Sequence, residues 1–546
     1  MTSPKSSFAS KKTNDRRTTT AKPTPSALLR PRSDWLWLAL VGLLVQGFWA
    51  LQLDYPSYTD AYYYATNGQR LAQGYGFTEQ IIWVYLDDPA GLPTPSHTYW
   101  MPLASLLAAA GYLIHDSFRG AQLFFWLLAG LLPLLTAAIV VWLGGQRWQF
   151  WLAGLLTAAG GFYAHFLSQP STFAPFAWAG GGCLLALAIA NRDLTGFKQA
   201  QLANLSGLKW WLLAGLLAGL AHLTRADGLL LLAVGGLIWL RQWRSGGALA
   251  ALLIGYGLVM GGWLLRNGLV LGTPLPTSGT QTIFLTSYAD IFAYGRSFDL
   301  AHLLAWGWPE IIRSRLDGLS VALQTFVAVS GYIVLTPFVI WGWLYVARQK
   351  GARLAPMSWY ALALLLAMSL LFTLPGSNGG LFHSSTALWP WCMALAAIGL
   401  DRAVAWLALR RRNWRPEEAR RVYAGIFVLA AFGLSGLVGL SRGPGVVASE
   451  AEVYGEIREL LPETAVVFAG DAPALHYHTG LPALSAPNEP PDVLLAMARR
   501  YQATHLLLDS SPPPALADLY HGTIISTAIQ LTAEIDNLRL YELGGE

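Results

Sequence analysis

The sequence predicts a mainly α-helical, polytopic membrane protein with about eleven transmembrane helices, followed by a small α/β domain. The first observation is composition: 54% of the 546 residues are hydrophobic and 12% are charged, whereas roughly a quarter of the residues in a soluble protein are charged. The second observation is a series of long apolar runs between residues 35 and 440. The third is a change after residue 441, where the apolar runs shrink to the length of strands.

Residues 1–33 predict a disordered basic tail in the cytoplasm. This segment is rich in Ser, Thr and Pro and holds eight Lys or Arg residues against one acid, Asp15. Such a polar stretch buries too little apolar surface to fold, and it is too long and polar for an ordinary cleaved signal peptide. We therefore expect a first span at residues 35–53 that runs outward and places the following loop, residues 54–118, outside the cytoplasm.

The transmembrane domain is expected over residues 34–441. Further spans are predicted at residues 120–143, 148–167, 173–191, 208–224, 228–240, 247–270, 317–347, 356–374, 384–400 and 422–440. The apolar run at residues 101–114 is shorter than the ~17–25 residues of a span and indicates an interfacial helix. Under this count the Lys and Arg residues of the short loops fall on the side of the basic tail, as the positive-inside rule requires. The short pair at 208–224 and 228–240 could instead be re-entrant.

Residues 442–546 predict a small extracytoplasmic α/β domain. Strands are expected at residues 465–471, 505–511, 529–535 and 538–543, with helices near 449–461 and 492–502. About a hundred residues are enough for a core of their own. We expect this domain to bind an acceptor or cover the mouth of a cavity, with its acids dispensable for chemistry.

Polar chemistry is concentrated in the first loop. This loop carries Asp54, Asp60, Arg70, Asp87, Asp88 and His97 in a chain with few charges. The stretch TDAYYYATNGQRLAQGYG indicates a short helix in which Asp60, Tyr64 and Asn67 share one face. Asp60 then lies near the helix N-terminus, where a carboxylate is favoured by unpaired N–H groups. On these grounds alone Asp60 could be no more than a helix cap.

The TDAYYY stretch and the RLAQGYG that follows it resemble the first extracytoplasmic loop of the GT-C superfamily of integral-membrane glycosyltransferases. The resemblance implies that Asp60 is a catalytic base, with Tyr64 and Asn67 able to orient it. Many members carry two adjacent acids here, whereas this chain has Thr59 in the first position. A second carboxylate could come from Asp54, Asp87 or Asp88, and this alternative stays open.

Other short motifs extend the resemblance. HTYWMPL, at residues 97–103, is similar to an element that borders the GT-C cavity, which makes His97 and Tyr99 candidates for contact with sugar or phosphate. A plain interfacial anchor is the competing interpretation, above all for Trp100. LFHSSTALWPW places His383 at the mouth of a late span, which also resembles a position in members of the superfamily.

The turn LTRADG puts Arg225 and Asp227 between two apolar runs on the outer side. Charges at a membrane edge are usually paired or functional, so mutual pairing of these two residues is one interpretation. The resemblance implies another, in which Arg225 faces the phosphate of a lipid-linked donor, because a guanidinium can hold phosphate oxygens at two points. Arg70, on the same outer side, is a further candidate for a cation at this phosphate. Arg266 could join them or extend to the interface.

Taken together, the resemblance implies an inverting glycosyltransferase of the cell membrane. The donor would be a polyprenyl-phosphate sugar and the acceptor a lipid, glycan or protein on the extracytoplasmic side. A transporter or flippase for a lipid-linked or glycan substrate is the alternative, and a structural or sensory membrane protein is a third class. The basic residues lie in short loops, which argues against nucleic-acid binding. No ligand motif supports a divalent metal or other cofactor, and Cys183 and Cys392 lie inside apolar runs.

Overall fold

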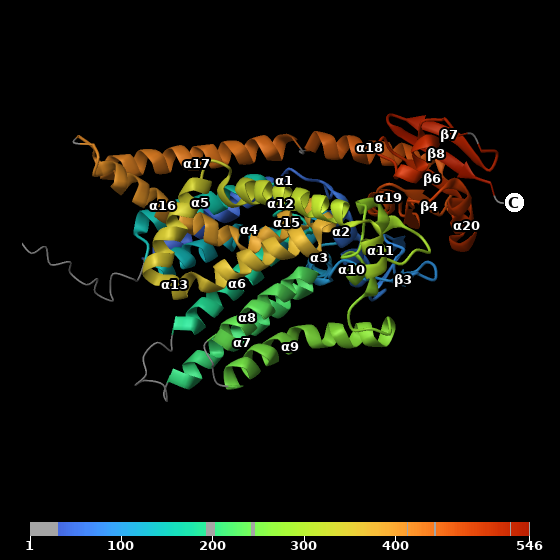
Figure 1. Ribbon diagram of the computed structural model, residues 1–546. Coiled ribbons are helices and arrows are strands. Elements are labelled where there is room, and N and C mark those ends of the chain that lie inside the picture. The colour runs from blue at the N-terminus through green and yellow to red at the C-terminus, as the bar shows by residue number, and fades with distance from the viewer. Residues whose placement is uncertain are drawn as a thin grey trace, which may run out of the picture.

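A computed structural model describes residues 31–192, 203–241, 246–411, 413–441, 444–524 and 526–544. The expected basic tail therefore lies almost wholly outside the described residues. A bundle of long helices fills most of the molecule, and a sheet domain sits at one end of it (Figure 1). The mainly helical prediction is confirmed.

The bundle holds the long helices α1 (Arg32–Leu51), α4 (Phe118–Leu143), α5 (Arg147–Ala159), α6 (Phe173–Arg192), α7 (Ala203–Thr224), α8 (Leu229–Arg241), α9 (Gly246–Val270), α12 (Trp308–Gly331), α13 (Thr336–Leu366), α16 (Trp389–Ala408) and α17 (Pro416–Ser441). Within the described ranges, 7 helices are long and apolar enough to cross a membrane. Helices α5 and α8 have only 13 residues each, fewer than a full crossing needs. The total of eleven spans therefore remains a prediction.

The predicted span at 317–347 is not one helix. Helix α12 ends at Gly331 and α13 begins at Thr336, because Tyr332 and Ile333 adopt left-handed backbone angles, with φ of 47° and 64°. Such angles are unfavourable in a right-handed helix and break it. Conversely, the expected loop near residue 350 is a kink at Lys350 inside α13, where φ is −142°.

The short basic loops gather at one end of the bundle. Arg147 forms an ion pair with Asp34 at 2.7 Å, and Arg420 pairs with Asp401 at 2.8 Å. Lys350 and Arg353 donate to carbonyl oxygens at the end of α4. The first loop and the sheet domain lie at the opposite end (Figure 1). This separation agrees with the predicted order of the spans.

The first loop forms α2 (Thr59–Ala72), β1 (Thr78–Glu79), β2 (Ile81–Ile82), β3 (Thr94–Pro95) and α3 (Leu103–Ile114). The short helix and the expected apolar helix at 101–114 are thus both present. Between α9 and α12 lie α10 (Thr277–Gln281), the 3₁₀ turn Tyr288–Phe292 and α11 (Leu300–Ala305), and α14 (Thr373–Pro375) and α15 (Leu381–Ser384) precede α16.

The C-terminal segment forms α18 (Pro444–Leu460), β4 (Val467–Ala469), α19 (Ala472–Thr479), β5 (Ala483–Ser485), α20 (Pro491–Tyr501), β6 (His505–Leu508), α21 (Ala517–Tyr520), β7 (Ile529–Ile535) and β8 (Leu538–Leu543). The four expected strands correspond to β4, β6, β7 and β8. Strand β5 and helix α19 were not predicted, since each is very short.

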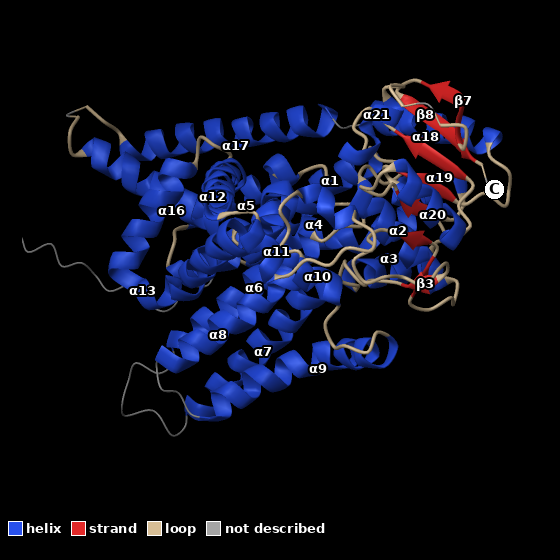
Figure 2. Ribbon diagram, turned by 45° about the vertical axis from the view of Figure 1, so that its right-hand side comes forward, coloured by secondary structure: helices blue, strands red, loops and turns tan. Residues whose placement is uncertain are grey.

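The sheet of this domain includes a strand from the first loop. Its six strands run in the order β2-β5-β4-β6-β8-β7, and β2 pairs in parallel with β5 through Ile81 and Ala483. Alternation along β4 buries Val467 with Tyr62 of α2 on one face and Phe468 with Met497 of α20 on the other. The sheet therefore crosses the predicted domain boundary at residue 442, and α2 forms part of one covering layer (Figure 2).

Candidate active site

Asp60 lies in the first turn of α2, where the first loop meets the helical bundle. The N-cap position of this helix is Tyr58, and its side chain makes no capping hydrogen bond. The carboxylate of Asp60 is 21% exposed and faces His383 of α15, with 3.9 Å between Asp60 Oδ2 and His383 Nε2. Residues more than three hundred positions apart in the chain thus meet at this point.

His383 is held in place by two contacts. Its Nδ1 lies 2.9 Å from the hydroxyl of Thr172, and its ring stacks on Phe173 with 4.1 Å between ring centroids. Both partners lie at the start of α6. These contacts leave Nε2 directed at Asp60.

Arg225 lies in the turn between α7 and α8, as predicted. Its Nε donates to Asp227 Oδ1 at 2.9 Å, so the mutual pairing foreseen from the sequence is present. Its Nη2 also donates to the carbonyl of Gly380, just before α15, at 3.4 Å. The guanidinium is 17% exposed and lies within electrostatic reach of Asp60 and Tyr64. Arg225 therefore links the turn to the segment just before α15, and its charge acts on Asp60.

Burial dominates the titration of this site. It raises the pKa of Asp60 to about 6, although the charge of Arg225 opposes the shift and that of Asp471 adds to it. Burial and Arg225 lower the pKa of His383. Burial also raises the pKa of Tyr64, Tyr99 and Tyr288, and the nearby charge of Asp60 adds to each shift. Near pH 7 the site thus holds an ionised Asp60, a cationic Arg225 and a neutral His383.

The chain is similar over most of its length to solved structures of ArnT and of an archaeal oligosaccharyltransferase. ArnT from Cupriavidus metallidurans in the apo state matches with a TM-score of 0.58 at 14% identity, over 94% of this chain and 99% of that one. The chain has the GT-C fold. ArnT from the same organism bound to undecaprenyl phosphate matches with a TM-score of 0.52 at 15% identity, over 94% and 100% of the two chains.

An oligosaccharyltransferase from Archaeoglobus fulgidus, in complex with Zn and sulfate, matches with a TM-score of 0.54 at 13% identity, over 87% of this chain and 67% of that one. No protein-family model and no curated protein sequence matches the chain. The resemblance drawn from short loop motifs is thus confirmed for the fold.

Two expected site residues lie elsewhere. Arg70, at the far end of α2, donates to the carbonyl and hydroxyl of Thr78 and lies over the ring of Tyr75. His97 is 1% exposed and bonds to Tyr63, whose hydroxyl accepts from the His97 backbone N–H at 2.9 Å. Burial and Arg266 lower the pKa of His97 to about 3. The bonds of both residues therefore lie within the first loop and stabilise its conformation.

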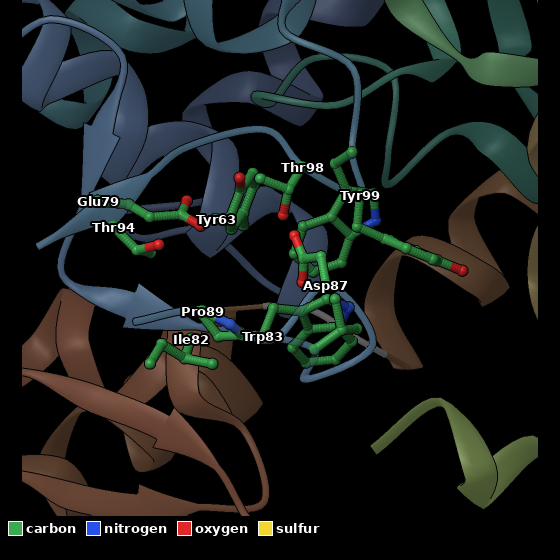
Figure 3. A pocket seen from close by; sticks show the side chains of 11 residues that line it. Tyr63, Glu79, Ile82, Trp83, Asp87, Pro89, Thr94, Thr98 and Tyr99 are labelled. Carbon is green, nitrogen blue, oxygen red and sulfur yellow. The ribbon is translucent and has the colours of Figure 1, made fainter. Parts of the chain in front are cut away.

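A small pocket lies in the first loop. Its walls include Glu79, Asp87, Thr98 and Tyr99, and its open space is about the size of one water molecule. Figure 3 shows the carboxylates of Glu79 and Asp87 on two sides of it, with Tyr63 behind. Trp83 and Trp100 stack on each other in the wall, with 4.7 Å between ring centroids. Because Tyr99 lines the pocket and lies within electrostatic reach of Asp60, the two spaces are neighbours.

The candidates for a second carboxylate have separate partners. Asp54 pairs with Arg119 at 2.7 Å and Asp88 with Arg500 at 2.8 Å, and both acids are exposed. Asp87 faces the pocket. The acid that reaches the start of α2 is Asp471, whose Oδ2 accepts from the Thr59 hydroxyl at 2.5 Å. Sequence reasoning missed it, although Asp471 is the last residue of the predicted strand at 465–471.

Among the described residues, no group of three or more His, Cys, Asp or Glu side chains is arranged to hold a metal ion. The chemistry available at the site is that of a carboxylate base beside a fixed cation and a neutral imidazole. This set can accept a proton from a hydroxyl and hold an anion next to it.

Proposed function

We propose that this protein is a glycosyltransferase that moves a sugar from a polyprenyl-phosphate donor to an acceptor on the extracytoplasmic side of the cell membrane. The observation that carries the proposal is the convergence of Asp60, Arg225 and His383. They come from α2, the α7–α8 turn and α15, and they meet at one end of a helical bundle with the GT-C fold.

Arg225 is assigned to the donor phosphate. A similar structure, ArnT, is described as bound to undecaprenyl phosphate, which supports a polyprenyl-phosphate donor here. The guanidinium is partly exposed and is held at two points by Asp227 and Gly380. A fixed, desolvated cation stabilises the negative charge that develops on a departing phosphate.

Asp60 is assigned as the base. In this reaction the acceptor oxygen forms a bond to sugar C1 while the bond from C1 to the phosphate oxygen breaks. The electron pair of that bond leaves with the polyprenyl phosphate, and the acceptor proton passes to Asp60. A single displacement of this kind inverts the configuration at C1. A pKa of about 6 suits the base, because the carboxylate is mostly ionised at pH 7 and still accepts a proton well.

The acceptor is assigned to the side of the Asp60 site on which Tyr99 lies. The Asp60 carboxylate and the Tyr99 hydroxyl can bond to the hydroxyl of an incoming acceptor. Lipid, glycan and protein acceptors all meet this description. His383 is held at the start of α6 and faces Asp60, and we assign it to orient the reacting groups.

The Asp60 end of the bundle is assigned to the outer face, with the N-terminal tail in the cytoplasm. The basic loops at the opposite end support this orientation. Membrane lipids surround the bundle in this arrangement, and the multi-pass chain resides in the cell membrane.

The purified protein should release polyprenyl phosphate from a radiolabelled polyprenyl-phosphate sugar when an acceptor extract is added. The same preparation in liposomes provides the control for a transporter or flippase. Counterflow of the labelled lipid without release of polyprenyl phosphate would overturn the glycosyltransferase proposal and support the transporter or flippase. If the protein shows neither release of polyprenyl phosphate nor counterflow, the result would point to the structural or sensory class.

A further inference from the structure

The start of α2 is tied to the C-terminal domain through one short hydrogen bond. Thr59 donates from its hydroxyl to Asp471 Oδ2 at 2.5 Å. The other carboxylate oxygen of Asp471 accepts from the backbone N–H of Ala474 at 3.0 Å and caps α19. Asp471 therefore has a fixed orientation, because each of its two oxygens has its own donor. Thr59 is the residue immediately before Asp60.

The position of Asp471 in the sheet explains how it reaches α2. The chain passes from β4 through α19 to β5 on one side of β4, and then through α20 to β6 on the other side. The order of strands reverses at the carboxyl end of β4. In open α/β sheets this switch point forms a crevice in which ligands bind. Asp471 lies at this end of β4, where it meets the first turn of α2 through Thr59.

Charged and titratable groups face Asp60 from several elements. Arg225 approaches from the α7–α8 turn and His383 from α15, and Tyr58 and Tyr64 lie on or next to α2. Tyr99 lies before α3, and Tyr288 belongs to the turn before α11. Asp471 is the acid that acts on Asp60 from the C-terminal domain, and its charge opposes that of Arg225.

We propose that Asp471 is a positioning residue for Asp60, so that the active site is completed by the C-terminal domain. Its carboxylate fixes the first turn of α2 through Thr59 and keeps Asp60 a stronger base beside the cation of Arg225. The adjacent pair of acids found in many GT-C loops is replaced here by Thr59 and an acid brought from a distant segment. This revises the expectation that the acids of the C-terminal domain are dispensable.

The catalytic role of Asp471 rests on the proposed function. The coupling between Asp471 and Asp60 can be measured without substrate. The carbonyl stretch of protonated Asp60 can be followed by infrared difference spectroscopy of the full-length protein and assigned by its absence in Asp60→Asn. For the wild type the midpoint of this band should lie near pH 6. In Asp471→Asn the amide oxygen can accept from Ala474 while the amide nitrogen donates to the Thr59 hydroxyl. The midpoint should fall by about half a unit or more, because a nearby negative charge is lost.

The matched control is Glu450→Gln. Glu450 of α18 also accepts from a hydroxyl of α2, that of Tyr62, at 3.3 Å, but it does not contribute to the shift of Asp60. This variant should leave the Asp60 midpoint in place. Thr59→Val removes the link while keeping the charge of Asp471, so it should broaden or displace the band without the full downward shift.

Turnover gives the second measurement. Asp471→Asn should lower kcat by about threefold to tenfold with little change in donor KM, since a weaker base slows proton removal. An unchanged Asp60 midpoint in Asp471→Asn, or an equal shift in Glu450→Gln, would overturn the proposal. If the wild type transfers no sugar but the midpoint still shifts, the proposed function fails while the coupling between Asp471 and Asp60 stands.

Discussion

Helix α2 carries two polar clusters that differ in nearly every physical respect. The Asp60 site, formed by Asp60, Arg225 and His383, joins the helix start to two bundle segments. The His97 cluster, formed by Tyr63, Asn67, Glu79, His97 and Arg266, lies on the side of the helix that faces the rest of the first loop. The side chains of the Asp60 site are partly exposed, at 14% to 21%, whereas His97 and Glu79 are buried.

The bonds of the two clusters explain the difference in role. In the His97 cluster Asn67 donates to Glu79 at 3.2 Å, and Arg266 donates to the carbonyls of Phe77 and Ser96. The Asn67–Glu79 bond lies within the first loop, and the bonds of Arg266 tie that loop to α9. In the Asp60 site the cation and the imidazole also come from distant segments, but the acid, the cation and the imidazole all remain partly exposed. Partial exposure of converging polar groups marks the reactive cluster, and burial of His97 and Glu79 marks the structural one.

The largest effect is expected for Asp60→Asn. This change keeps the shape of the side chain but removes its basicity, and general-base catalysis contributes roughly 10²–10⁴-fold. We therefore expect turnover to fall at least about a hundredfold, with donor affinity nearly unchanged. Single-turnover kinetics with radiolabelled donor measure both quantities.

The controls for this change are Asp54→Asn and Asp87→Asn. Asp54 is bound to Arg119 and Asp87 faces the neighbouring pocket, so both should cost much less. Near-normal turnover in Asp60→Asn, together with a large loss in Asp87→Asn, would move the base from the Asp60 site to the pocket.

The second effect concerns the donor. Arg225→Ala should weaken donor binding by about tenfold to a hundredfold, as expected when a charge-assisted phosphate contact is lost. Arg225→Lys should recover only part of the affinity, because Lys lacks the two-point geometry. Binding of labelled polyprenyl phosphate to purified protein measures the change.

Asp227 provides the test for the competing interpretation. If Arg225 serves only its ion pair with Asp227, then Asp227→Ala should be equally harmful and the double variant should recover activity. Recovery would make Arg225 a structural residue of the α7–α8 turn and remove it from the donor site.

Much of the fold follows from the sequence because its signals are local. Apolar runs predicted the helical bundle, and alternation with turn residues predicted β4, β6, β7 and β8. The break between α12 and α13 could not be predicted, since Tyr332 and Ile333 adopt left-handed angles that no local preference favours. The pairing of β2 with β5 could not be predicted from the sequence either, because a two-residue strand carries no periodic signal.

The candidate site follows from the sequence only in part. Asp60, Arg225 and His383 were singled out by motifs, and the structure brings them together. Asp227 is near them as the partner of Arg225, and Tyr64 and Tyr99 lie within electrostatic reach of Asp60. His97 and Arg70 were singled out by the same reasoning, but their bonds stay within the first loop. Asp471 was missed because its role depends on long-range packing of the sheet against α2.

The smallest effect is expected for Glu79→Gln, and it tests the structural side of the comparison. Burial raises the pKa of Glu79 from 4.5 to about 8. The folded state therefore keeps a proton that the unfolded state loses near pH 4.5, so this residue makes the protein less stable as the pH rises toward 8. The Tm of the wild type in detergent should fall relative to that of Glu79→Gln between pH 5 and pH 8.

Gln is neutral at every pH, and its carbonyl can still accept from Asn67, so the variant removes the titration and keeps the bond. The difference in Tm between the two proteins should be smallest at the acid end and grow with pH, while kcat at pH 7 changes little, because Glu79 is mostly protonated there. A Tm difference that does not depend on pH would mean that Glu79 titrates normally in the folded protein. A large loss of kcat would instead show that the His97 cluster takes part in the chemistry, and the contrast between the two clusters of α2 would have to be abandoned.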